Sequence, residues 1–420
     1  MKPINVFAAA MAASFAAFTL NAAPSISEDG IMVTQDAVSR MVKVSYTLVG
    51  GPAIVTAEFL TNGVSIGRAG SQNVWGDVNR IVRNGACQFR WSPLKAWPNQ
   101  QVEAGAFQVR LTAWAMDAAP DYMVIDLTAP RTVARDTVSF YQSEDLLPLE
   151  VTNRLYKTDR LVMRKIPAEG VRWMMGGVST EFAYAAKWET QRYVTLTNDY
   201  FMAVYPVTQA QYAWFKGSAA SCQFKGDDRP VDTVSYEGLR GSASGGYDWP
   251  NDGHAVAANS VLGVLATYTN LEGFDLPTDA EWEYACRAGC ATAFYDGTTL
   301  PKDMYNHLTL TNLAWTADNA DKTTHPVGLK LPNEFGLFDM LGNVAEWVLD
   351  WAVEDYSTDE RVAPVGGESG TVRFLRGGGW PHDERTNRIA AHQYQAPTGS
   401  YIGSNYGSCG FRPVLSADFK

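Results

Sequence analysis

Alternation of apolar and polar residues dominates the chain from about residue 31 to residue 128. In the run 42–48 apolar side chains fall at every second position, and the run 107–112 repeats the pattern. A period of two places successive side chains on opposite faces of a strand. Gly and Pro interrupt the runs at 50–52 and at Asn62-Gly63, which is typical of short antiparallel strands joined by tight turns.

Two further apolar runs, at 54–60 and 122–127, continue the series of short strands. Strands at this spacing favour a small antiparallel sandwich of two sheets. We therefore expect residues 28–130 to form an N-terminal β-sandwich of immunoglobulin or fibronectin-III type. No cluster of catalytic side chains occurs in it, so we interpret it as an accessory domain.

The first 22 residues have the pattern of an export signal. Lys2 precedes an apolar run from Val6 to Leu20, and small residues follow at 21–23. This order predicts a secretory signal peptide at 1–22 and a secreted or periplasmic protein. The run is shorter than the ~20 residues of a spanning helix, and no later run is long enough, so we expect no membrane span after cleavage.

The net charge of the chain argues against nucleic acid as a binding partner. The chain has 34 Lys and Arg against 45 Asp and Glu, a net charge of -11, and no block of basic residues. Because nucleic-acid binding depends on clustered positive charge, nucleic acid is not an expected partner.

The five cysteines leave one question of pairing open. Cys286 and Cys290 lie four residues apart near the end of a predicted helix. On a helix their Cβ atoms would be about 5–6 Å apart, beyond the ~4 Å of a disulfide. They pair only if Gly289 ends the helix and turns the chain back. The alternative is two small buried thiols, and the sequence does not decide between them.

A different pattern begins after residues 131–157, which are rich in polar breaks and are predicted to be a linker. Thr208 with Gln211, and Thr278 with Glu281, have the spacing of a capping box before an aromatic helix face. These pairs predict short helices that start after each threonine.

From about residue 158 to residue 416 the sequence resembles the formylglycine-generating enzyme, or sulfatase-modifying factor, domain. The resemblance implies a compact, irregular α+β fold related to C-type lectins, which we assign to residues 158–418. With the sandwich before it, the chain is expected to be multidomain. The matching segments occur in the family's order at 163–177, 205–215, 229–236, 276–289, 324–328, 332–347, 374–380 and 410–412.

The resemblance also implies structural calcium. Calcium takes oxygen ligands from carboxylates and backbone carbonyls. The implied ligands are the side chains of Asp339 and Glu346 and the carbonyls of Gly342 and Val344. In the alternative interpretation Glu346 is a buried hydrogen-bond acceptor for neighbouring donors.

A second calcium site of the family would use Asn312 and the Leu313 carbonyl, with an acid near Asn319 or Asp321. The spacing of these residues is shorter here than the family's pattern.

Oxidases of this family hold copper with two cysteines. The segment 376–387 aligns without a gap and has His382 and Asn387 where the cysteines should stand. Soft thiolates select Cu(I), and an imidazole with an amide does not replace them. Cys409 is a single thiol and does not make a pair. We therefore assign no catalytic residue and do not expect copper.

Two interpretations of the following residues stay open. One is a three-ligand metal site drawn from His382, Asp383, Glu384 and His392. The other is a polar loop leading into a strand, in which Arg388 and His392 bind carbonyls. The residues that could line a cleft here are Trp380, His382, Arg388 and Cys409.

These observations favour an exported, non-oxidase binding or accessory module that acts on an extracytoplasmic protein or glycan. The alternative is an oxidoreductase of the formylglycine-generating type that acts on a sulfatase cysteine by altered chemistry. Whether the chain is an enzyme depends on what His382 and Asn387 do.

Overall fold

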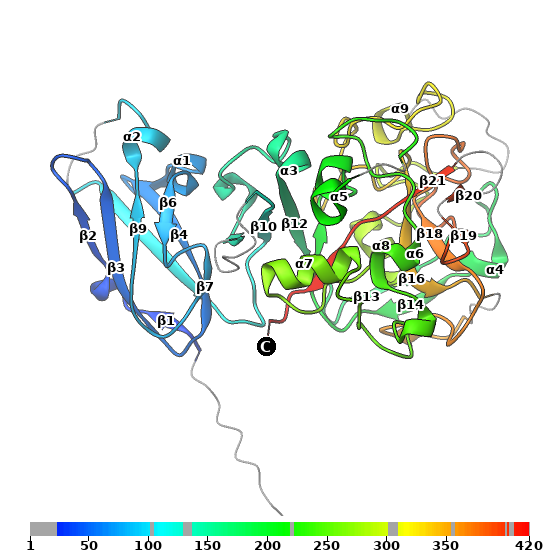
Figure 1. Ribbon diagram of the computed structural model, residues 1–420, viewed down its shortest axis with the longest axis horizontal. Helices are drawn as coiled ribbons and strands as arrows, with labels where there is room; N and C mark the ends of the chain where they lie inside the picture. Colours follow the sequence, from blue (N-terminus) through cyan, green and yellow to red (C-terminus); the bar gives the residue numbers. More distant parts are fainter. Residues whose placement is uncertain are drawn as a thin grey trace, which may run out of the picture.

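The computed structural model has two parts that lie side by side along its longest axis (Figure 1). The chain returns to the boundary between them at its C-terminal end, where the Phe419 N–H donates to the Met116 carbonyl (2.9 Å). The predicted signal peptide, 1–22, lies outside the described residues. The structure describes residues 23–100, 105–128, 137–218, 222–300, 310–353, 358–399, 401–402 and 407–419.

Two antiparallel sheets build the N-terminal part. The first contains β1 (Ser25–Ile26), β2 (Met32–Gln35), β3 (Val42–Val49), β6 (Val74–Gly76) and β8 (Gly85–Trp91). The second contains β4 (Ala53–Thr61), β5 (Val64–Ser65), β7 (Arg80–Val82) and β9 (Phe107–Trp114). The connections carry the short helices η1 (Glu28–Gly30), α1 (Arg68–Ser71) and α2 (Pro93–Ala96). Strand β3 pairs with β8, and β4 pairs with β9 over its whole length.

The predicted alternation decides which side chains form the core of this part. In β3 the buried side chains alternate with exposed or half-buried ones. Phe59 of β4 stacks on Trp91 of β8, with ring centroids 4.6 Å apart. The two sheets therefore share one apolar core, and the prediction of antiparallel sheets is confirmed. The buried members of β3 are Val42, Val44, Tyr46 and Leu48.

The end of this part differs from the prediction. Residues 122–127 were expected to close the sandwich at residue 130, but β10 (Tyr122–Asp126) pairs with β11 (Val138–Tyr141) and β12 (Arg160–Ile166) of the second part. The segment 131–157, expected to be a linker, contains β11, η3 (Glu144–Leu146) and the start of α3 (Leu155–Thr158). An alternating run predicts a strand but does not say which sheet it joins, because pairing depends on distant residues.

Three sheets and short helices build the second part. A five-stranded sheet has the order β11-β10-β12-β15-β22, with β15 (Tyr200–Ala203) and β22 (Val414–Ser416). A three-stranded sheet contains β13 (Arg172–Met175), β14 (Arg192–Thr195) and β17 (Arg361–Val362). The third has the order β19-β18-β16-β21-β20. Its strands are β16 (Ala345–Trp351), β18 (Arg373–Arg376), β19 (Gln393–Gln395), β20 (Tyr401–Ile402) and β21 (Gly407–Gly410).

Both predicted capping boxes are confirmed. Thr208 precedes α5 (Gln209–Lys216), and its N–H donates to the Gln211 side chain (3.0 Å). Thr278 precedes α8 (Asp279–Arg287), and its N–H donates to Glu281 (2.8 Å). The remaining helices are α4 (Ala186–Glu189), α6 (Tyr236–Arg240), η4 (Ala243–Gly245), α7 (Val261–Thr269) and α9 (Leu310–Leu313).

Buried arginines hold the loops of the second part. Arg412, for example, pairs with Glu346 (3.0 Å) and donates to the carbonyls of Ala203 (2.7 Å) and Phe338 (2.8 Å). Arg412 thus neutralises a buried carboxylate and also donates to two backbone carbonyls. Five arginines are fully buried: Arg240, Arg373, Arg376, Arg388 and Arg412.

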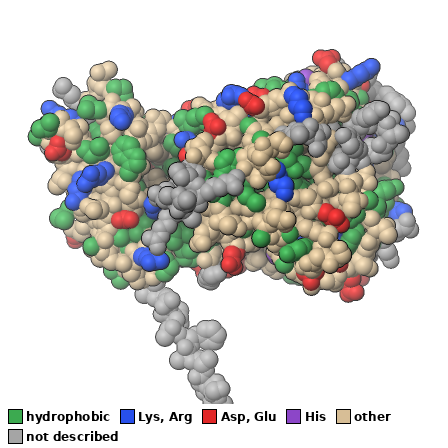
Figure 2. Space-filling view, in the orientation of Figure 1, with side chains coloured by type: hydrophobic (Ala, Val, Ile, Leu, Met, Phe, Trp, Pro, Cys, Tyr) green, Lys and Arg blue, Asp and Glu red, His purple; other side chains and the backbone are tan. Residues whose placement is uncertain are grey.

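The two parts are joined by specific contacts. Arg68 of α1 pairs with Glu150 (2.7 Å) and donates to the carbonyls of Glu144 and Leu149. On the face shown in Figure 2, basic side chains are dispersed among acidic ones. None of the helices in the described ranges is long and apolar enough to cross a membrane.

All five cysteines are free in the structure. The Cys290 sulfur lies 2.8 Å from the Thr292 hydroxyl, and Cys286 is buried in the core behind α8. Gly289 has a φ of +91°, as a chain reversal requires, yet the two thiols stay separate. The alternative of two buried thiols is therefore correct for Cys286, whereas Cys290 is unpaired but only half-buried.

Candidate functional site

The candidate site lies on the loop that follows β18. Gly377 and Gly378 lead out of the strand with φ values of +84° and +72°. A Cβ atom on Gly378 would lie 2.3 Å from the Asn387 side-chain oxygen. Only glycine leaves room for this close approach, so the loop from 379 to 387 folds back against its own beginning.

His382 stands on this loop beside Gln393 of β19. The Gln393 side-chain nitrogen lies 3.1 Å from His382 Nε2, and the His382 carbonyl accepts from the Ala317 N–H (2.9 Å). Burial lowers the pKa of the His382 imidazole below its ordinary value. The ring is therefore neutral at neutral pH and offers one donor and one acceptor.

Asn387 braces the loop. Its side chain is fully buried, and its nitrogen donates to the carbonyls of His382 (3.0 Å) and Asp383 (2.7 Å). Both protons of the amide are thus used within the turn. The second position that the resemblance assigns to a copper cysteine has a structural role here.

Three polar atoms around His382 are buried without a hydrogen-bond partner among the described residues: Trp380 Nε1, Asn387 Oδ1 and Gln393 Oε1. Trp380 is 7% exposed and packs edge-on against Phe224, with ring centroids 5.5 Å apart. Unpartnered buried polar atoms are rare in folded proteins, and water or a ligand usually satisfies them. The cluster of Trp380, His382, Asn387 and Gln393, called the His382 cluster below, therefore has unused capacity to bind a polar group.

The other two predicted cleft residues lie elsewhere. Arg388 pairs with Glu181 (2.8 Å) and Glu189 (2.8 Å) and is fully buried, which corrects its assignment to a cleft. Cys409 lies in β21, where it pairs with Ala345 of β16. Burial raises the pKa of the Cys409 thiol well above its ordinary value, so it is not a thiolate.

Copper does not fit these residues. The cluster offers a neutral imidazole and an amide whose nitrogen is committed, whereas Cu(I) requires soft ligands. The described part of the chain contains no group of three His, Cys, Asp or Glu side chains that could hold a metal. His392, considered for such a set, contacts Asp279 (3.0 Å), and Asp383 pairs with Arg385.

The two carboxylates of the predicted calcium set already have hydrogen-bond partners within the protein. Glu346 accepts from Trp282 Nε1 (2.7 Å) and pairs with Arg412 (3.0 Å), so its carboxylate has donors within the protein. Asp339 accepts from the Gly328 N–H (2.6 Å), and burial raises the pKa of its carboxyl. Each carboxylate has its own donors. Both carboxylates of the set Asp339, Gly342, Val344 and Glu346 are thus engaged within the protein, and calcium at this set stays a prediction.

The second predicted calcium set also has other partners. The Leu313 carbonyl accepts from the Tyr295 hydroxyl (3.0 Å), and the Asn312 carbonyl accepts from the Leu331 N–H (2.9 Å). The side-chain oxygen of Asn319 accepts from the Thr316 N–H (2.8 Å) and closes its own turn. The Leu313 carbonyl and the Asn319 side chain thus have partners within the protein, while calcium at this second set stays a prediction.

Sequence reasoning missed Gln393 and Phe224. Gln393 follows His392 in a strand with no motif of its own, and Phe224 lies far from Trp380 in the chain. Neither residue carries a local signal that would connect it with the loop. Only the folded arrangement brings them to the His382 cluster.

Comparison with known proteins identifies the family to which most of the second part is similar. Residues 165–417 match the model of the sulfatase-modifying factor enzyme 1-like domain. A formylglycine-generating enzyme of Streptomyces coelicolor is 34% identical over 217 residues, which are 48% of this chain and 64% of that protein. A chaperone protein LppX of Paenibacillus barcinonensis is 28% identical over 220 residues, 47% of this chain and 74% of its own length.

A serine/threonine-protein kinase pkn1 of Chlamydia pneumoniae is 31% identical over 220 residues, half of this chain but only 32% of the kinase. Among solved structures, Treponema denticola variable protein 1 has a TM-score of 0.47 at 23% identity, covering 61% of this chain and 95% of that one. PvdO from Pseudomonas aeruginosa has the same TM-score at 24% identity, covering 61% and 94%. The family model spans more than half of the sequence, and the chain belongs to the sulfatase-modifying factor enzyme 1-like family.

Proposed function

We propose that this protein is an exported, non-oxidase member of its family that binds an extracytoplasmic protein or glycan as an accessory module. The observation that carries the proposal is the His382 cluster. It has three buried polar atoms that no other described residue hydrogen-bonds, at the place where the resemblance puts the copper of the family's oxidases. Such atoms suit recognition of hydroxyl or amide groups, because those groups both donate and accept hydrogen bonds.

The chemistry of the cluster supports binding over oxidation. His382 is neutral, Asn387 is committed to the turn, and the Cys409 thiol is protonated and buried. None of these groups supplies a soft anionic ligand. A step that needs copper beside a substrate thiol therefore has no support from this chain's own residues.

The relatives also support a role that differs between members. Proteins named as a kinase, a chaperone and a formylglycine-generating enzyme all share the domain with this chain. We propose that residues 28 to about 114 form a separate accessory sandwich that presents the family domain. The signal-like segment 1–22 supports export.

The second candidate is an oxidoreductase of the formylglycine-generating type that works by altered chemistry. The 34% identity to the Streptomyces coelicolor enzyme favours it. The two candidates differ in whether a substrate thiol is consumed.

A peptide assay distinguishes them. Mature protein, copper, oxygen and reductant are incubated with a Cys-x-Pro-x-Arg peptide, and the peptide is followed by mass spectrometry. The proposal expects an unchanged peptide mass. A product in which an aldehyde replaces the thiol, formed in proportion to the protein and lost in Cys409→Ser or His382→Ala, would support the oxidoreductase instead.

A further inference from the structure

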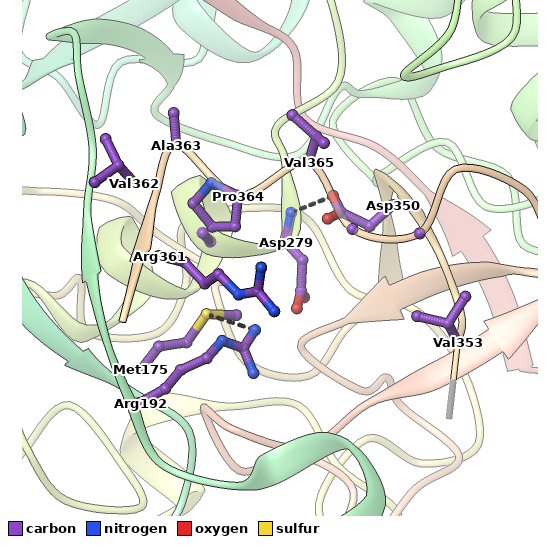
Figure 3. Close-up of a pocket in the computed structure, with 13 residues that line it drawn as sticks. Met175, Arg192, Asp279, Asp350, Val353, Arg361, Val362, Ala363, Pro364 and Val365 are labelled. Carbon is purple, nitrogen blue, oxygen red and sulfur yellow. Dashed lines mark hydrogen bonds between the residues drawn. The ribbon is translucent and has the colours of Figure 1, made fainter. Parts of the chain in front are cut away.

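A second candidate site lies away from the His382 cluster, in a cavity of about 360 Å3. The three-stranded sheet, the start of α8 and the segment 363–367 surround it (Figure 3). A volume near 300 Å3 or more is in the range of small-molecule sites, roughly 300–1,000 Å3. The cavity is therefore large enough for a small organic ligand.

Positive charge enters the cavity from two strands. Arg192 of β14 is 4% exposed, and Arg361 of β17 is exposed at the mouth. Figure 3 shows both guanidinium groups pointing into the cavity toward Asp279. Among the described residues Arg361 makes no ion pair, so its charge is available to a ligand.

The carboxylates in the cavity cancel only part of this charge. Asp279 pairs with Arg376 (2.9 Å) and His392 (3.0 Å), which approach from outside the cavity, and it also interacts with the charge of Arg192 inside it. Asp350 accepts from the Asp279 N–H (2.7 Å), and burial together with the Asp279 charge raises the pKa of its carboxyl to about 8. At neutral pH Asp350 is thus mostly uncharged, so Asp279 offsets the charge of Arg192, and Arg361 leaves the cavity with an excess of positive charge.

The remaining walls are apolar. Val362 is 66% exposed and Val365 is 40% exposed, although both line the cavity. Val353 and Pro364 continue the same surface. Exposed apolar side chains beside a partly buried cationic group suit a ligand with one charged end and an apolar body.

We propose that this cavity binds a small organic anion. Its carboxylate, sulfate or phosphate group contacts Arg192 and Arg361, and its apolar body packs against Val353, Val362 and Val365. Guanidinium groups bind such oxyanions in two-pronged hydrogen bonds, which explains why two arginines converge here. The inference does not depend on the function of the His382 cluster.

The test is a titration of the full mature protein at constant ionic strength, followed by calorimetry. The probes are inorganic sulfate, inorganic phosphate, phenyl sulfate and phenylacetate. Arg361→Gln removes the charge at the mouth, and Arg83→Gln removes an exposed charge in the N-terminal part as the matched control. Both side chains are exposed, so neither change should prevent folding.

We expect Arg361→Gln to weaken phenyl sulfate or phenylacetate binding about tenfold, equivalent to one lost charge-assisted hydrogen bond, while Arg83→Gln binds like the original chain. Val362→Ser should weaken the organic anions and leave inorganic sulfate unchanged. Absence of binding by every probe, or equal weakening by both arginine variants, would overturn the site. Equal affinity for inorganic and phenyl sulfate would overturn the apolar body of the ligand.

Discussion

The two parts of the molecule are stabilised by different means. The N-terminal sheets enclose an apolar core with aromatic rings at its centre, and none of the charged residues described there is buried. The second part buries five whole arginines, and four of them pair with buried carboxylates. Both parts hold buried hydrophobic side chains, so the difference lies in how each part satisfies its polar backbone.

In the N-terminal part, regular strand pairing satisfies the polar groups of the backbone. Strand β4 exchanges backbone hydrogen bonds along its whole length with β9, so few carbonyls are left for side chains. The loops of the second part lack this ladder. There Arg240 pairs with Asp275 and also donates to the carbonyls of Tyr247 and Gly253, which lie in a loop.

The comparison has a consequence for metal binding. The resemblance to the family leads one to expect calcium as the group that holds irregular loops together. In this chain Arg412 neutralises the Glu346 carboxylate and binds two carbonyls at once, as a bound cation could also do. A buried guanidinium and a bound cation are thus two solutions to one problem, and a cation would compete with Arg412 at Glu346.

The largest expected effect comes from breaking one of these pairs. Arg412→Met leaves Glu346 charged and buried and removes donors from two carbonyls, which should lower the free energy of unfolding by about 3–5 kcal/mol. Urea denaturation measures it. Arg154→Met, at an arginine that is 62% exposed, serves as the control and should change stability by less than about 1 kcal/mol. A loss of similar size in both variants would contradict the role of Arg412.

A matched change in the N-terminal part acts through packing alone. Leu48→Ala deletes a side chain that is 1% exposed, and we expect a loss of about 2–5 kcal/mol. This loss should be the same at low and high salt, because no charge is involved. A strong salt dependence of the Leu48→Ala effect would break the distinction between the two parts.

Asp350 provides a smaller, pH-dependent test. Folding raises the pKa of this carboxyl to about 8 from 3.8, so between these values the folded chain holds a proton that the unfolded chain releases. Its contribution to stability is complete below pH 3.8 and is lost as pH rises toward 8. Asp350→Asn can still accept from the Asp279 N–H and does not titrate. The variant should therefore gain about 1 kcal/mol or more relative to the original chain between pH 5 and pH 8.

The control for the Asp350 experiment is a carboxylate that lies outside the cavity. Asp29→Asn removes an exposed carboxylate in the N-terminal part and should leave the difference between pH 5 and pH 8 unchanged. A flat pH profile for the original chain would contradict the burial of a neutral Asp350. The groups that act on Asp350, or line the cavity with it, are Asp279, Glu281, Arg373, Arg192 and Arg361.

The smallest expected effect is that of a chelator. Because Glu346 is already paired with Arg412, removal of calcium with EGTA should shift the melting temperature by less than about 1 °C. By comparison, a bound ion whose free concentration is 100 times its Kd would add about 2.7 kcal/mol to the free energy of unfolding. Thermal melting with and without added calcium measures the shift. A clear drop on chelation, abolished by Glu346→Gln, would restore the calcium site that the sequence predicted.

Local features of this fold were predictable from the sequence, and distant pairings were not. The capping box at Thr278 involves residues three apart, and the alternation in β3 is visible within one strand, so both were found. The partner of Glu346 lies 66 residues away, and that of Arg388 lies 207 residues away. Without these distant partners, the family resemblance implied calcium at Glu346, and Arg388 was assigned to a cleft.

In the candidate site, too, local features were predictable from the sequence and distant contacts were not. Its loop was located because Gly377 and Gly378 form part of a recognisable motif, and His382 could be placed by alignment. The contribution of Gln393 depends on how β19 pairs with β18, which no local pattern encodes. The cavity at Arg192 and Arg361 was not predicted, since β17 pairs with β14 across more than 160 residues of chain.

Metal analysis of the mature protein tests most directly our proposal that this family member does not use copper. The protein is loaded with Cu(I), passed through a desalting column and measured by mass spectrometry of the metal. We expect copper far below an equimolar amount, and no difference between the original chain and Cys409→Ser. Equimolar copper that survives desalting and is lost in Cys409→Ser or His382→Ala would contradict the account.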